Sequence, residues 1–303
     1  MSLVLFLVRR LLAIAVLAWA VTVAAFTLFR IGLKNPAMTA QITAQLGAHE
    51  PAAVQYLHYV GRLLHGDLGQ SMTVGVSVGS LLWASLPPTL SLMIGGLVLW
   101  LVAGTLTGAL SALRPGSLAD RGVTVAALTA LVLPTFLTAL LLLDVSSSLG
   151  WLQPGYVPFS QSPWQWLGRL ILPWVAIAAT QVGTTARLTR AAVLDVLGED
   201  YIRTARASGL GRGKIFFWQV LRPAVSPLLA SITVGFGVLL GSAAIVDQVF
   251  ALGGIGQALL TAVKTGDIMV IMGATLLAFL LISVVSLVTD ICQALLDPRV
   301  HVT

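Results

Sequence analysis

The pair Gly213 and Lys214 lies within residues 203–217, RTARASGLGRGKIFF, a glycine-rich and basic stretch of the kind that can cradle phosphate. A P-loop has the pattern G-x-x-x-x-G-K-[ST], in which backbone N–H groups hold the phosphates and the hydroxyl binds magnesium. Here the first position of that pattern is Ser208 and the last is Ile215. The residues before the stretch also have a helical pattern, whereas a P-loop follows a strand. The sequence therefore predicts no nucleotide site in this chain.

The other reactive side chains do not form a catalytic pattern. His49, His58 and His65 all fall in one polar segment, without an HExxH motif. We expect these histidines to be hydrated surface residues. His58 and His65 are seven residues apart and could share a helix face, so a metal site is the alternative. The G-x-S-x-G elbow of serine hydrolases is missing. We therefore predict no catalytic residue, no metal and no cofactor held by this chain, which is not expected to be an enzyme.

Three aspartates lie near the ends of long apolar segments, where a charge is costly and often functional. Asp247 and Asp144 are near the ends of the fifth and third such segments, and Asp290 is near the end of the sixth. A helix end can also be solvated, which is the alternative interpretation. We name Asp247 and Asp144 as candidates for a polar translocation pathway.

The composition of the chain indicates whether it lies in water or in a membrane. Only 9% of the 303 residues are charged and 57% are hydrophobic, and the mean hydropathy is +0.96. An ordinary soluble domain has about 25% charged residues, so this chain is predicted to be a polytopic membrane protein. In a membrane protein, the position of the basic residues along the chain indicates orientation, so the net charge of +6 is not taken as a sign of nucleic-acid binding. A single cysteine, Cys292, excludes an internal disulfide.

Six segments are long and apolar enough to span a bilayer, which takes about 20 residues. They comprise residues 10–30, 86–113, 121–145, 169–190, 224–249 and 268–293. The first exceeds the apolar core of a typical signal peptide, and we interpret it as an uncleaved anchor. We expect an all-α membrane protein with six transmembrane helices in a single domain, residues 1–303. Its longest connections would be residues 31–85 and 191–222.

The basic residues set the orientation. With a cytoplasmic N-terminus, 12 of the 17 Lys and Arg residues fall in the inner segments and 5 in the outer ones, which agrees with the positive-inside rule. Both termini and residues 191–222 are then predicted to be cytoplasmic, and residues 31–85 extracytoplasmic. Residues 199–222 carry five basic side chains. Burying these in lipid would cost about 15 kcal/mol at roughly 3 kcal/mol each, so this segment is not a span.

Two outer segments have structure-forming patterns. Residues 50–66, EPAAVQYLHYVGRLLHG, are predicted to form a helix, with Glu50 and Pro51 in its first turn. One apolar side of that helix would comprise Val54, Tyr56, Leu57, Val60 and Leu64. Residues 149–168 combine aromatic rings with prolines and are predicted to be an interfacial loop.

The cytoplasmic loop is predicted to be a helix, a break and a second helix. In the first helix, EDYIRTARAS, Tyr201, Ile202 and Ala205 recur at one-turn spacing, and Arg203 and Arg206 share another side. Small residues there would allow close approach of another surface. A short, exposed, half-apolar helix on a membrane protein is more often a docking element than a catalytic one.

Five glycines are interpreted in two ways, one as a helix cap and two pairs as packing contacts. Gly209 fits a left-handed C-cap, a conformation that costs other residues about 1–2 kcal/mol, and a second amphipathic piece, KIFFWQVL, follows it. The pairs in GTLTG (104–108) and GVLLG (237–241) allow helices to approach closely, and we interpret them as packing contacts.

The motifs together resemble one family, the ABC importer permeases of the dipeptide, oligopeptide and nickel branch. The stretch DYIRTARASGLGRGKIFFWQVLRPAVSPLL is similar to their cytoplasmic signature loop, the EAA loop, with RTA at 203–205 and Gly209 as the central glycine. The resemblance extends over essentially the whole chain. It is carried, in order, by GDLGQS (66–71), LPPTLSLMIGG, ALRPGSLADR, LPTF, LGWLQPGY, VFALGGIGQAL and ALLDPR (294–299). The departures from the usual family pattern are Arg203, Gln219, Pro223 and Asp247.

The resemblance implies the type I ABC importer permease fold in a plasma or inner membrane. This chain would pair with a homologous permease, two ATP-binding subunits and an extracytoplasmic substrate-binding protein, within a lipid bilayer and without nucleic acid. ATP and magnesium would be bound by the ATPase subunits, and the loop at 191–222 would carry the coupling helix. The ATPase-coupling residues implied are Asp200, Tyr201, Arg203, Thr204, Ala205, Arg206, Ser208, Gly209 and Leu210.

The cargo expected from the resemblance is a dipeptide or oligopeptide. Nickel complexes, haem and glutathione are the alternatives within the family. A stand-alone secondary transporter or channel is a more remote alternative, because such proteins usually place ionisable residues near the midplane of broken helices, and the acids here lie near segment ends.

Overall fold

The computed structural model of the protein describes residues 3–32, 51–150 and 154–296. Within these residues the regular structure is helical, apart from an isolated bridge between Gln70 and Ser77. The helices are α1 (Leu3–Gly32), α3 (Ala52–Leu64), α4 (Val78–Leu113), α5 (Leu118–Val132), α6 (Thr135–Ser148), α7 (Pro163–Leu197), α8 (Asp200–Ala207), α9 (Arg212–Lys214), the π-helix η1 (Ile215–Leu221), α10 (Arg222–Phe250), α11 (Ile255–Thr265) and α12 (Ile268–Leu296).

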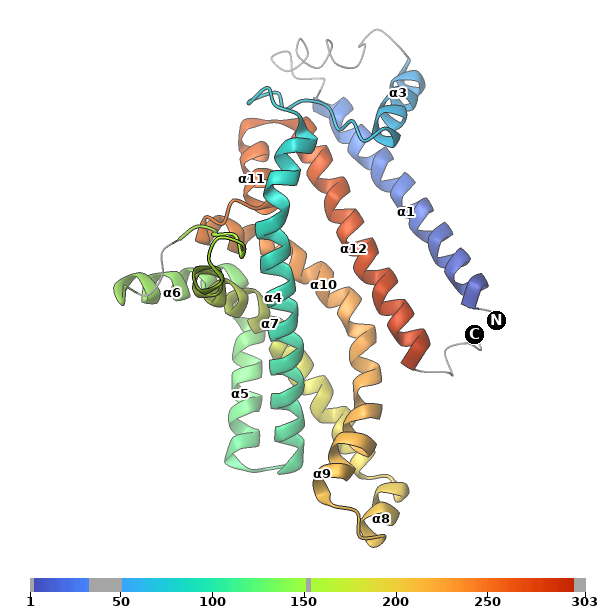
Figure 1. Cartoon of the computed structure of the whole chain (residues 1–303), viewed down its shortest axis with the longest axis vertical. Helices are drawn as coiled ribbons and strands as arrows, with labels where there is room; N and C mark the ends of the chain where they lie inside the picture. The colour runs from blue at the N-terminus through green and yellow to red at the C-terminus, as the bar shows by residue number, and fades with distance from the viewer. Residues whose placement is uncertain (1–2, 33–50, 151–153, 297–303) are drawn as a thin grey trace.

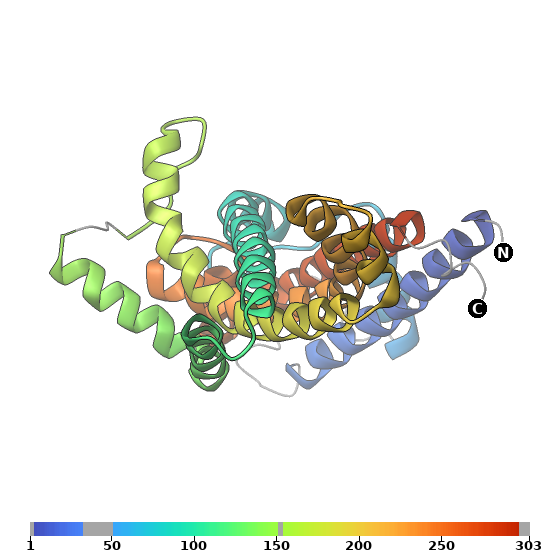
Figure 2. The ribbon, with the colours of Figure 1, turned by 90° about the horizontal axis from the view of Figure 1, so that it is seen from below.

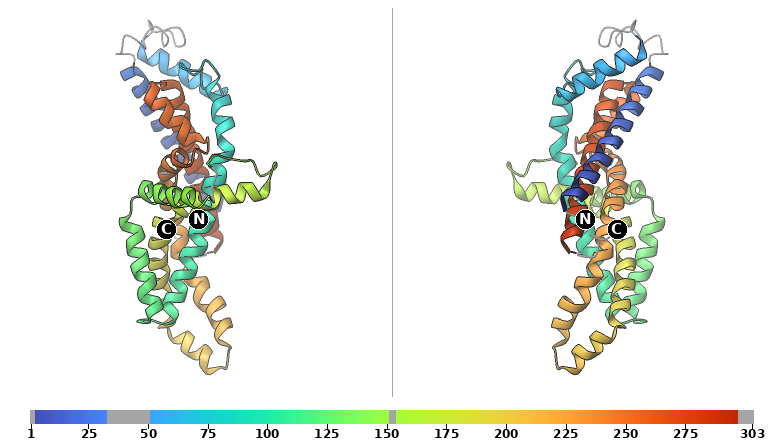
Figure 3. Two further views of the ribbon diagram at one scale, coloured as in Figure 1. Left: turned by 90° about the vertical axis from the view of Figure 1, so that its left-hand side faces the viewer. Right: turned by 90° about the vertical axis from the view of Figure 1, so that its right-hand side faces the viewer.

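The long helices run roughly along one direction, with α3 at one end of the molecule and α8 at the other (Figure 1). We call these the α3 end and the α8 end. Helices α4 and α7 lie in the middle and contact α5, α6 and α10, whereas α1 packs on α12 and α3. The views from the side place α3 and α8 at opposite ends as well (Figure 3).

Glycines bring α4 and α7 into close contact, as the GTLTG pattern predicts. A Cβ on Gly104 would lie 2.8 Å from the Cβ of Thr185, and one on Gly108 would lie 2.3 Å from the carbonyl oxygen of Ala186. The second pair behaves differently. Gly237 and Gly241 of α10 have nothing within 4 Å of a built Cβ, so the packing expected for GVLLG is not made among the residues that the structure describes.

Four helical stretches are apolar and long enough to cross a membrane: Val8–Thr27, Val78–Leu113, Ser231–Phe250 and Ile268–Cys292. They correspond to the first, second, fifth and sixth expected spans. Helix α4 begins at Val78, eight residues before the expected start at 86, so Pro87 and Pro88 lie inside it. A fifth span results if α5 and α6 are taken together.

The third expected span, 121–145, is not one straight helix. Helices α5 and α6 meet at an angle of 106°, and α6 extends away from the main body together with the start of α7 (Figure 2). The break is at Leu133, which is extended with a ψ of 119°, followed by Pro134 at the N-cap of α6. A residue before proline is disfavoured in the helical region and proline lacks an N–H, which explains the bend.

Helix α7 contains the fourth expected span, 169–190, but is less apolar than the four spanning stretches. Its second half carries Gln181, Thr185 and Thr189, and the latter two are buried. A helix surrounded by other helices can satisfy such groups locally. The buried Trp100 of α4, for example, donates its indole N–H to Thr185 Oγ1.

Helix α3 forms as expected, but its buried face differs from the predicted one. The buried residues are Gln55 and Tyr59, whereas Leu57 and Leu64 are 66% and 81% exposed. The reason is contact with α1: Tyr59 stacks on Phe26 at 6.1 Å between ring centroids, and Tyr56 packs edge-on against the same ring at 5.4 Å. Glu50, expected in the first turn, and His49 lie outside the described residues.

The predicted interfacial loop, 149–168, ends earlier than expected, because α7 begins at Pro163. Aromatic residues before α7 and in its first turns pack on α4. Tyr156 and Trp166 both reach Ser91 Oγ, at 3.1 and 3.2 Å, and Trp174 donates to the Ser91 carbonyl at 2.9 Å. Trp164 stays 82% exposed. The segment therefore combines packed and exposed aromatic rings. Residues 151–153 of the predicted interfacial loop lie outside the described residues.

Candidate functional site

Helix α8 spans Asp200–Ala207 and forms the tip of the molecule at the α8 end. It follows α7 after only two residues, Gly198 and Glu199, and the N–H of Gly198 still bonds to the carbonyl of Leu194. Asp200 lies in the first turn and Arg206 in the last, the charge arrangement that favours the helix dipole. The first helix predicted in the loop is confirmed.

The inner face of α8 packs against its own chain. Ile202 is fully buried and Ala205 is 7% exposed, in a cluster with Ala109 and Ala112 of α4 and Val193 of α7. Ala205 is one of the nine implied coupling residues, and its position in this cluster makes it a packing residue of the loop.

The outer face of α8 and the turn after it are open to solvent. Arg203 bonds to Asp200 at 3.4 Å, and the Tyr201 hydroxyl donates to the carbonyl of Gln219 at 3.2 Å. Ser208 donates to the Thr204 carbonyl at 2.9 Å. The exposed members of the implied coupling set are Asp200, Tyr201, Arg203, Thr204, Arg206, Ser208 and Gly209, and Leu210 is half-buried.

Gly209 ends α8 in the left-handed conformation that the sequence predicts, with a φ of +78°. Its N–H bonds to the Arg206 carbonyl at 3.1 Å, and the N–H of Leu210 bonds to the Ala205 carbonyl at 3.3 Å. These two bonds are those of a Schellman motif, which commonly adds an apolar contact from the residue after the glycine. Leu210 makes such a contact with the buried cluster, so the orientation of the turn is fixed.

The second predicted helix of the loop is continuous with α10. The short helix α9 leads into the π-helix η1, and α10 begins directly after it. Ile215 and Val220 of η1 are buried with Ile202, whereas Phe217 and Trp218 are 63% and 67% exposed. A π-helical segment of this kind is uncommon and is frequent at functional sites.

A cavity of about 370 Å³ lies between α4, α10, α11 and α12, and Asp247 lines it. Its other lining residues are mostly small or aliphatic, and they include Gly237 and Gly241, around which the described part of the chain leaves open space. The exposed residues Val234, Val238 and Ile245 are on the same helix as this pair.

The carboxylate of Asp247 is directed at the start of α11. It is 3% exposed and accepts the N–H groups of Gly254 at 2.9 Å and Gln257 at 2.8 Å. Thr89 Oγ1 accepts the next N–H, from Ile255, at 2.8 Å. A Cβ on Gly254 would lie 2.6 Å from Thr89 Oγ1, so this approach requires glycine. Asp247 thus borders the cavity and caps the helix that closes it.

The other two aspartates lie elsewhere. Asp144 is exposed on α6 and is not among the residues that line the Asp247 cavity. Asp290 of α12 forms an ion pair with Arg10 of α1, which also contacts Ser286. The structure therefore gives Asp290 a partner on another helix, in place of the solvated helix end that was the alternative interpretation.

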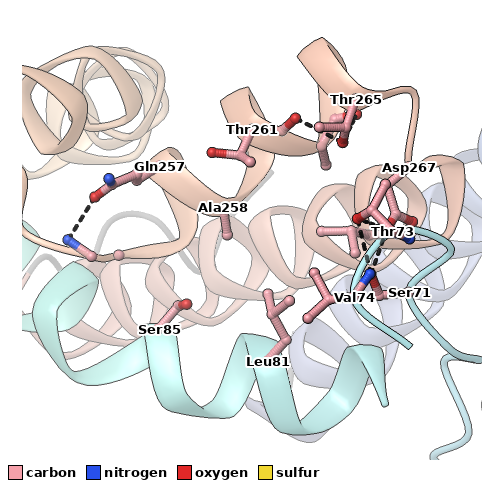
Figure 4. Close-up of a pocket in the computed structure, with 14 residues that line it drawn as sticks. Ser71, Thr73, Val74, Leu81, Ser85, Gln257, Ala258, Thr261, Thr265 and Asp267 are labelled. Atoms are coloured by element: carbon pink, nitrogen blue, oxygen red, sulfur yellow. Dashed lines mark hydrogen bonds between the residues drawn. The ribbon is translucent and has the colours of Figure 1, made fainter. Parts of the chain in front are cut away.

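A second cavity, of about 230 Å³, lies at the α3 end between residues 71–74, α4 and α11 (Figure 4). Asp267 is 1% exposed at its rim and accepts the hydroxyls of Ser71 and Thr73, at 2.5 and 2.9 Å. Burial raises the pKa of Asp267, but these hydrogen bonds outweigh it and hold that pKa below its ordinary value. Sequence reasoning did not single out this residue, although an aspartate before an apolar helix is a common N-cap signal.

The histidines do not converge in the described part of the chain. The Nδ1 atom of His65 lies 2.7 Å from the carbonyl oxygen of Gly61, one turn earlier in α3. Across residues 3–32, 51–150 and 154–296, no three His, Cys, Asp or Glu side chains are grouped as metal ligands would be.

Comparison with curated proteins gives relatives of nearly full length. The oligopeptide transport system permease AppB of Bacillus subtilis is 35% identical over 266 residues, which cover 86% of this chain and 84% of AppB. A Sinorhizobium fredii chain named as a peptide ABC transporter permease is 32% identical over 98% of this chain and 99% of its own length. A Brucella suis chain named as a peptide transport system permease is 34% identical over 88% of this chain and 86% of its own length.

Among solved structures, a chain of the MetNI methionine ABC transporter in an inward-facing conformation matches with a TM-score of 0.58 at 20% identity. The match covers 72% of this chain and 97% of that one, so the fold is that of an ABC importer permease. The family described as binding-protein-dependent transport system inner membrane component matches residues 104–302. Such a component transports and does not catalyse, and it implies an ATPase and a substrate-binding protein as partners. This chain belongs to the family of binding-protein-dependent transport system inner membrane components.

Proposed function

We propose that this chain is a transmembrane permease subunit of an ATP-driven importer, and that its cargo is a dipeptide or oligopeptide. The names of the relatives from Bacillus subtilis and Sinorhizobium fredii support the peptide cargo. Nickel complexes, haem and glutathione remain the alternatives, and the binding protein does much of the selection among them.

The observation that carries the coupling role is the two-sided construction of α8. Its inner face is buried in the chain through Ile202 and Ala205, and its outer face is free. A partner ATPase that binds the outer face would therefore move the ends of α4 and α7 with it. The residues proposed to contact the ATPase are Asp200, Tyr201, Arg203, Thr204, Arg206, Ser208, Gly209 and Leu210, with Ala205 supporting them from inside.

ATP and magnesium are bound by the ATPase subunits in this proposal. The α8 end is then the cytoplasmic end and the α3 end is extracytoplasmic, which agrees with the excess of basic residues near α8. Both termini are cytoplasmic. ATP shifts the pathway from inward- to outward-facing only if it binds one state much more tightly than the other, and a shift from 1:99 to 99:1 takes about 5.5 kcal/mol.

The translocation pathway runs between this chain and a homologous permease. The exposed side of α10 supports this, because Val234, Val238 and Ile245 are exposed there. On the same helix, the described residues leave open space around Gly237 and Gly241. Asp247 borders the pathway through the cavity of about 370 Å³. Asp144 is a pathway candidate only if the partner chain covers α6.

Replacement of Gly209 by valine tests the coupling role. At a φ of +78° a side chain costs about 1–2 kcal/mol, and β-branched residues fit worst. Gly211→Val is the matched control, because Gly211 has open space around it and no positive φ. In the assembled importer, Gly209→Val should lower the uptake of radiolabelled dialanine per ATP hydrolysed, while the control keeps the wild-type ratio.

Two results would contradict the proposal. Unchanged uptake in a correctly inserted Gly209→Val importer would exclude α8 as the coupling element. Uptake of nickel or haem, with no uptake of dialanine or trialanine, would keep the transporter class and overturn the peptide cargo.

A further inference from the structure

An ion pair with a buried carboxylate joins three helices near the α8 end. Arg190 of α7 donates from Nε to Asp120 Oδ1 at 2.8 Å and from Nη2 to Asp120 Oδ2 at 2.9 Å. The side chain of Asp120 is 6% exposed and that of Arg190 is 32% exposed. A bidentate arginine–carboxylate contact of this kind fixes both distance and orientation.

Asp120 is also bonded to the end of α4 and to the turn that leads into α5. It accepts the N–H of Gly116 at 2.8 Å and the hydroxyl of Ser111. Its own N–H donates to Ser117, the N-cap of α5. One carboxylate therefore connects α4, the α4–α5 turn, the first turn of α5 and α7.

Backbone contacts continue this connection along the helices. A Cβ on Gly108 would lie 2.3 Å from the Ala186 carbonyl oxygen, and one on Gly183 would lie 2.6 Å from the Ala127 carbonyl oxygen. Helix α7 thus touches both α4 and α5 through backbone atoms in the two turns before Arg190, on the side of the ion pair away from α8. Such close seams leave little room for the helices to slide past one another.

The ion pair lies close to the coupling helix. Arg190 is seven residues before Leu197, the last residue of α7, a distance of about 10 Å at 1.5 Å per residue. Helix α8 begins three residues later, and its buried residues Ile202 and Ala205 contact the cluster that contains Val193 of α7. Figure 1 shows α8 below the lower end of α4, at the same end of the molecule as the start of α5.

We propose that Asp120 and Arg190 are positioning residues that lock the ends of α4, α5 and α7 into one body, so that a displacement of α8 is transmitted to the helices of the pathway. The proposal rests on the proposed coupling role of α8. Without the lock, α8 and the end of α7 would move while α4 and α5 stay behind. A pair with only a stabilising role would change the stability of the chain but not the relative motion of α5 and α8.

Spin-label distances measured in the assembled importer separate these roles. Cys292, the single native cysteine, is first replaced by serine. One label pair joins Thr204 of α8 to Val125 of α5, and the other joins Thr204 to Val284 of α12, all three positions being exposed. Each pair is measured without nucleotide and with ATP and vanadate.

In the wild type, we expect the 204–284 distance to change with nucleotide and the 204–125 distance to stay constant. Asp120→Asn should make the 204–125 distance change with nucleotide. It should also lower dialanine uptake per ATP hydrolysed by about twofold to thirtyfold, the range for changes within a coupling network. Arg187→Gln is the matched control, because Arg187 is exposed on α7 one turn before Arg190, and it should behave as the wild type.

Arg190→Lys is the second variant if Asp120→Asn does not assemble, since it keeps the charge but loses the bidentate contact. A constant 204–125 distance in both variants, or a 204–125 distance that already changes in the wild type, would overturn the lock. A constant 204–284 distance in the wild type would instead overturn the coupling role of α8, and the lock with it.

Discussion

The seam between α4 and α7 gives a sharp quantitative prediction at Gly108. A Cβ there would lie 2.3 Å from the Ala186 carbonyl oxygen, 2.9 Å from the Ala186 Cα and 2.9 Å from the Thr189 Cβ. Two of these atoms belong to the backbone, so they cannot rotate away. Gly108→Ala therefore forces α7 to shift relative to α4.

The size of the effect follows from two opposing contributions. Overpacking of a close contact costs about 1–3 kcal/mol, and replacing a helical glycine by alanine returns about 0.8–1 kcal/mol of helix propensity. Because the 2.3 Å contact is with a backbone oxygen, we place the overpacking cost in the upper part of its range, about 2–3 kcal/mol. The net loss is then about 1–2 kcal/mol. At about 2–4 °C for each kcal/mol, the apparent Tm should fall by about 2–8 °C.

The assay is the thermal stability of the detergent-solubilised importer, followed by fluorescence-detected size exclusion. Gly168→Ala is the control, because it adds the same methyl group to an exposed position of α7 where nothing lies within 4 Å. That variant should match or slightly exceed the wild type. A Gly108→Ala importer as stable as the wild type, or an equal loss in Gly168→Ala, would refute the close seam.

Two further predictions concern the buried aspartates. Asp247→Asn should place an amide NH₂ group against one of the N–H groups at the start of α11, which costs about 1–3 kcal/mol. We expect faster hydrogen exchange in residues 254–258 as a result. Unchanged exchange in these residues would contradict the capping role of Asp247. The lowered pKa of Asp267 means that its contribution to stability is complete above the unfolded value of about 3.9 and is lost as pH falls through the folded value. Asp267→Asn should therefore increase proteolysis of residues 71–77 at pH 7. Its difference from the wild type should shrink as the pH falls below about 4 and vanish once the pH is below the folded pKa of Asp267. A difference that does not shrink as the pH falls would argue against the carboxylate.

The coupling loop could be predicted closely from the sequence because its signals are local. The charges of α8, the turn at Gly209 and the apolar spacing of Ile202 and Ala205 are all within ten residues. The ion pair of Asp120 and Arg190 could not be found in the same way, since its members are 70 residues apart in the chain. Each of them alone is an ordinary charge near a helix end.

Two other differences have tertiary causes. Hydropathy favoured one span over 121–145, but Pro134 and the extended Leu133 separate it into α5 and α6. The buried face of α3 is set by α1, because Tyr56 reaches Thr22 with its hydroxyl at 2.8 Å and packs on Phe26. An apolar pattern cannot indicate which neighbour will cover it.

Site-specific cross-linking of α8 tests the coupling role most directly. In a Cys292→Ser background, Thr204→Cys and Ser208→Cys place exposed thiols on α8 and at its end, and Val125→Cys places one on the exposed side of α5. We predict that a short bifunctional thiol reagent links the first two positions to the ATPase subunit of the assembled importer, and leaves Val125→Cys unlinked. The absence of any ATPase adduct at Thr204→Cys and Ser208→Cys, in an importer that still hydrolyses ATP and transports dialanine, would contradict the account.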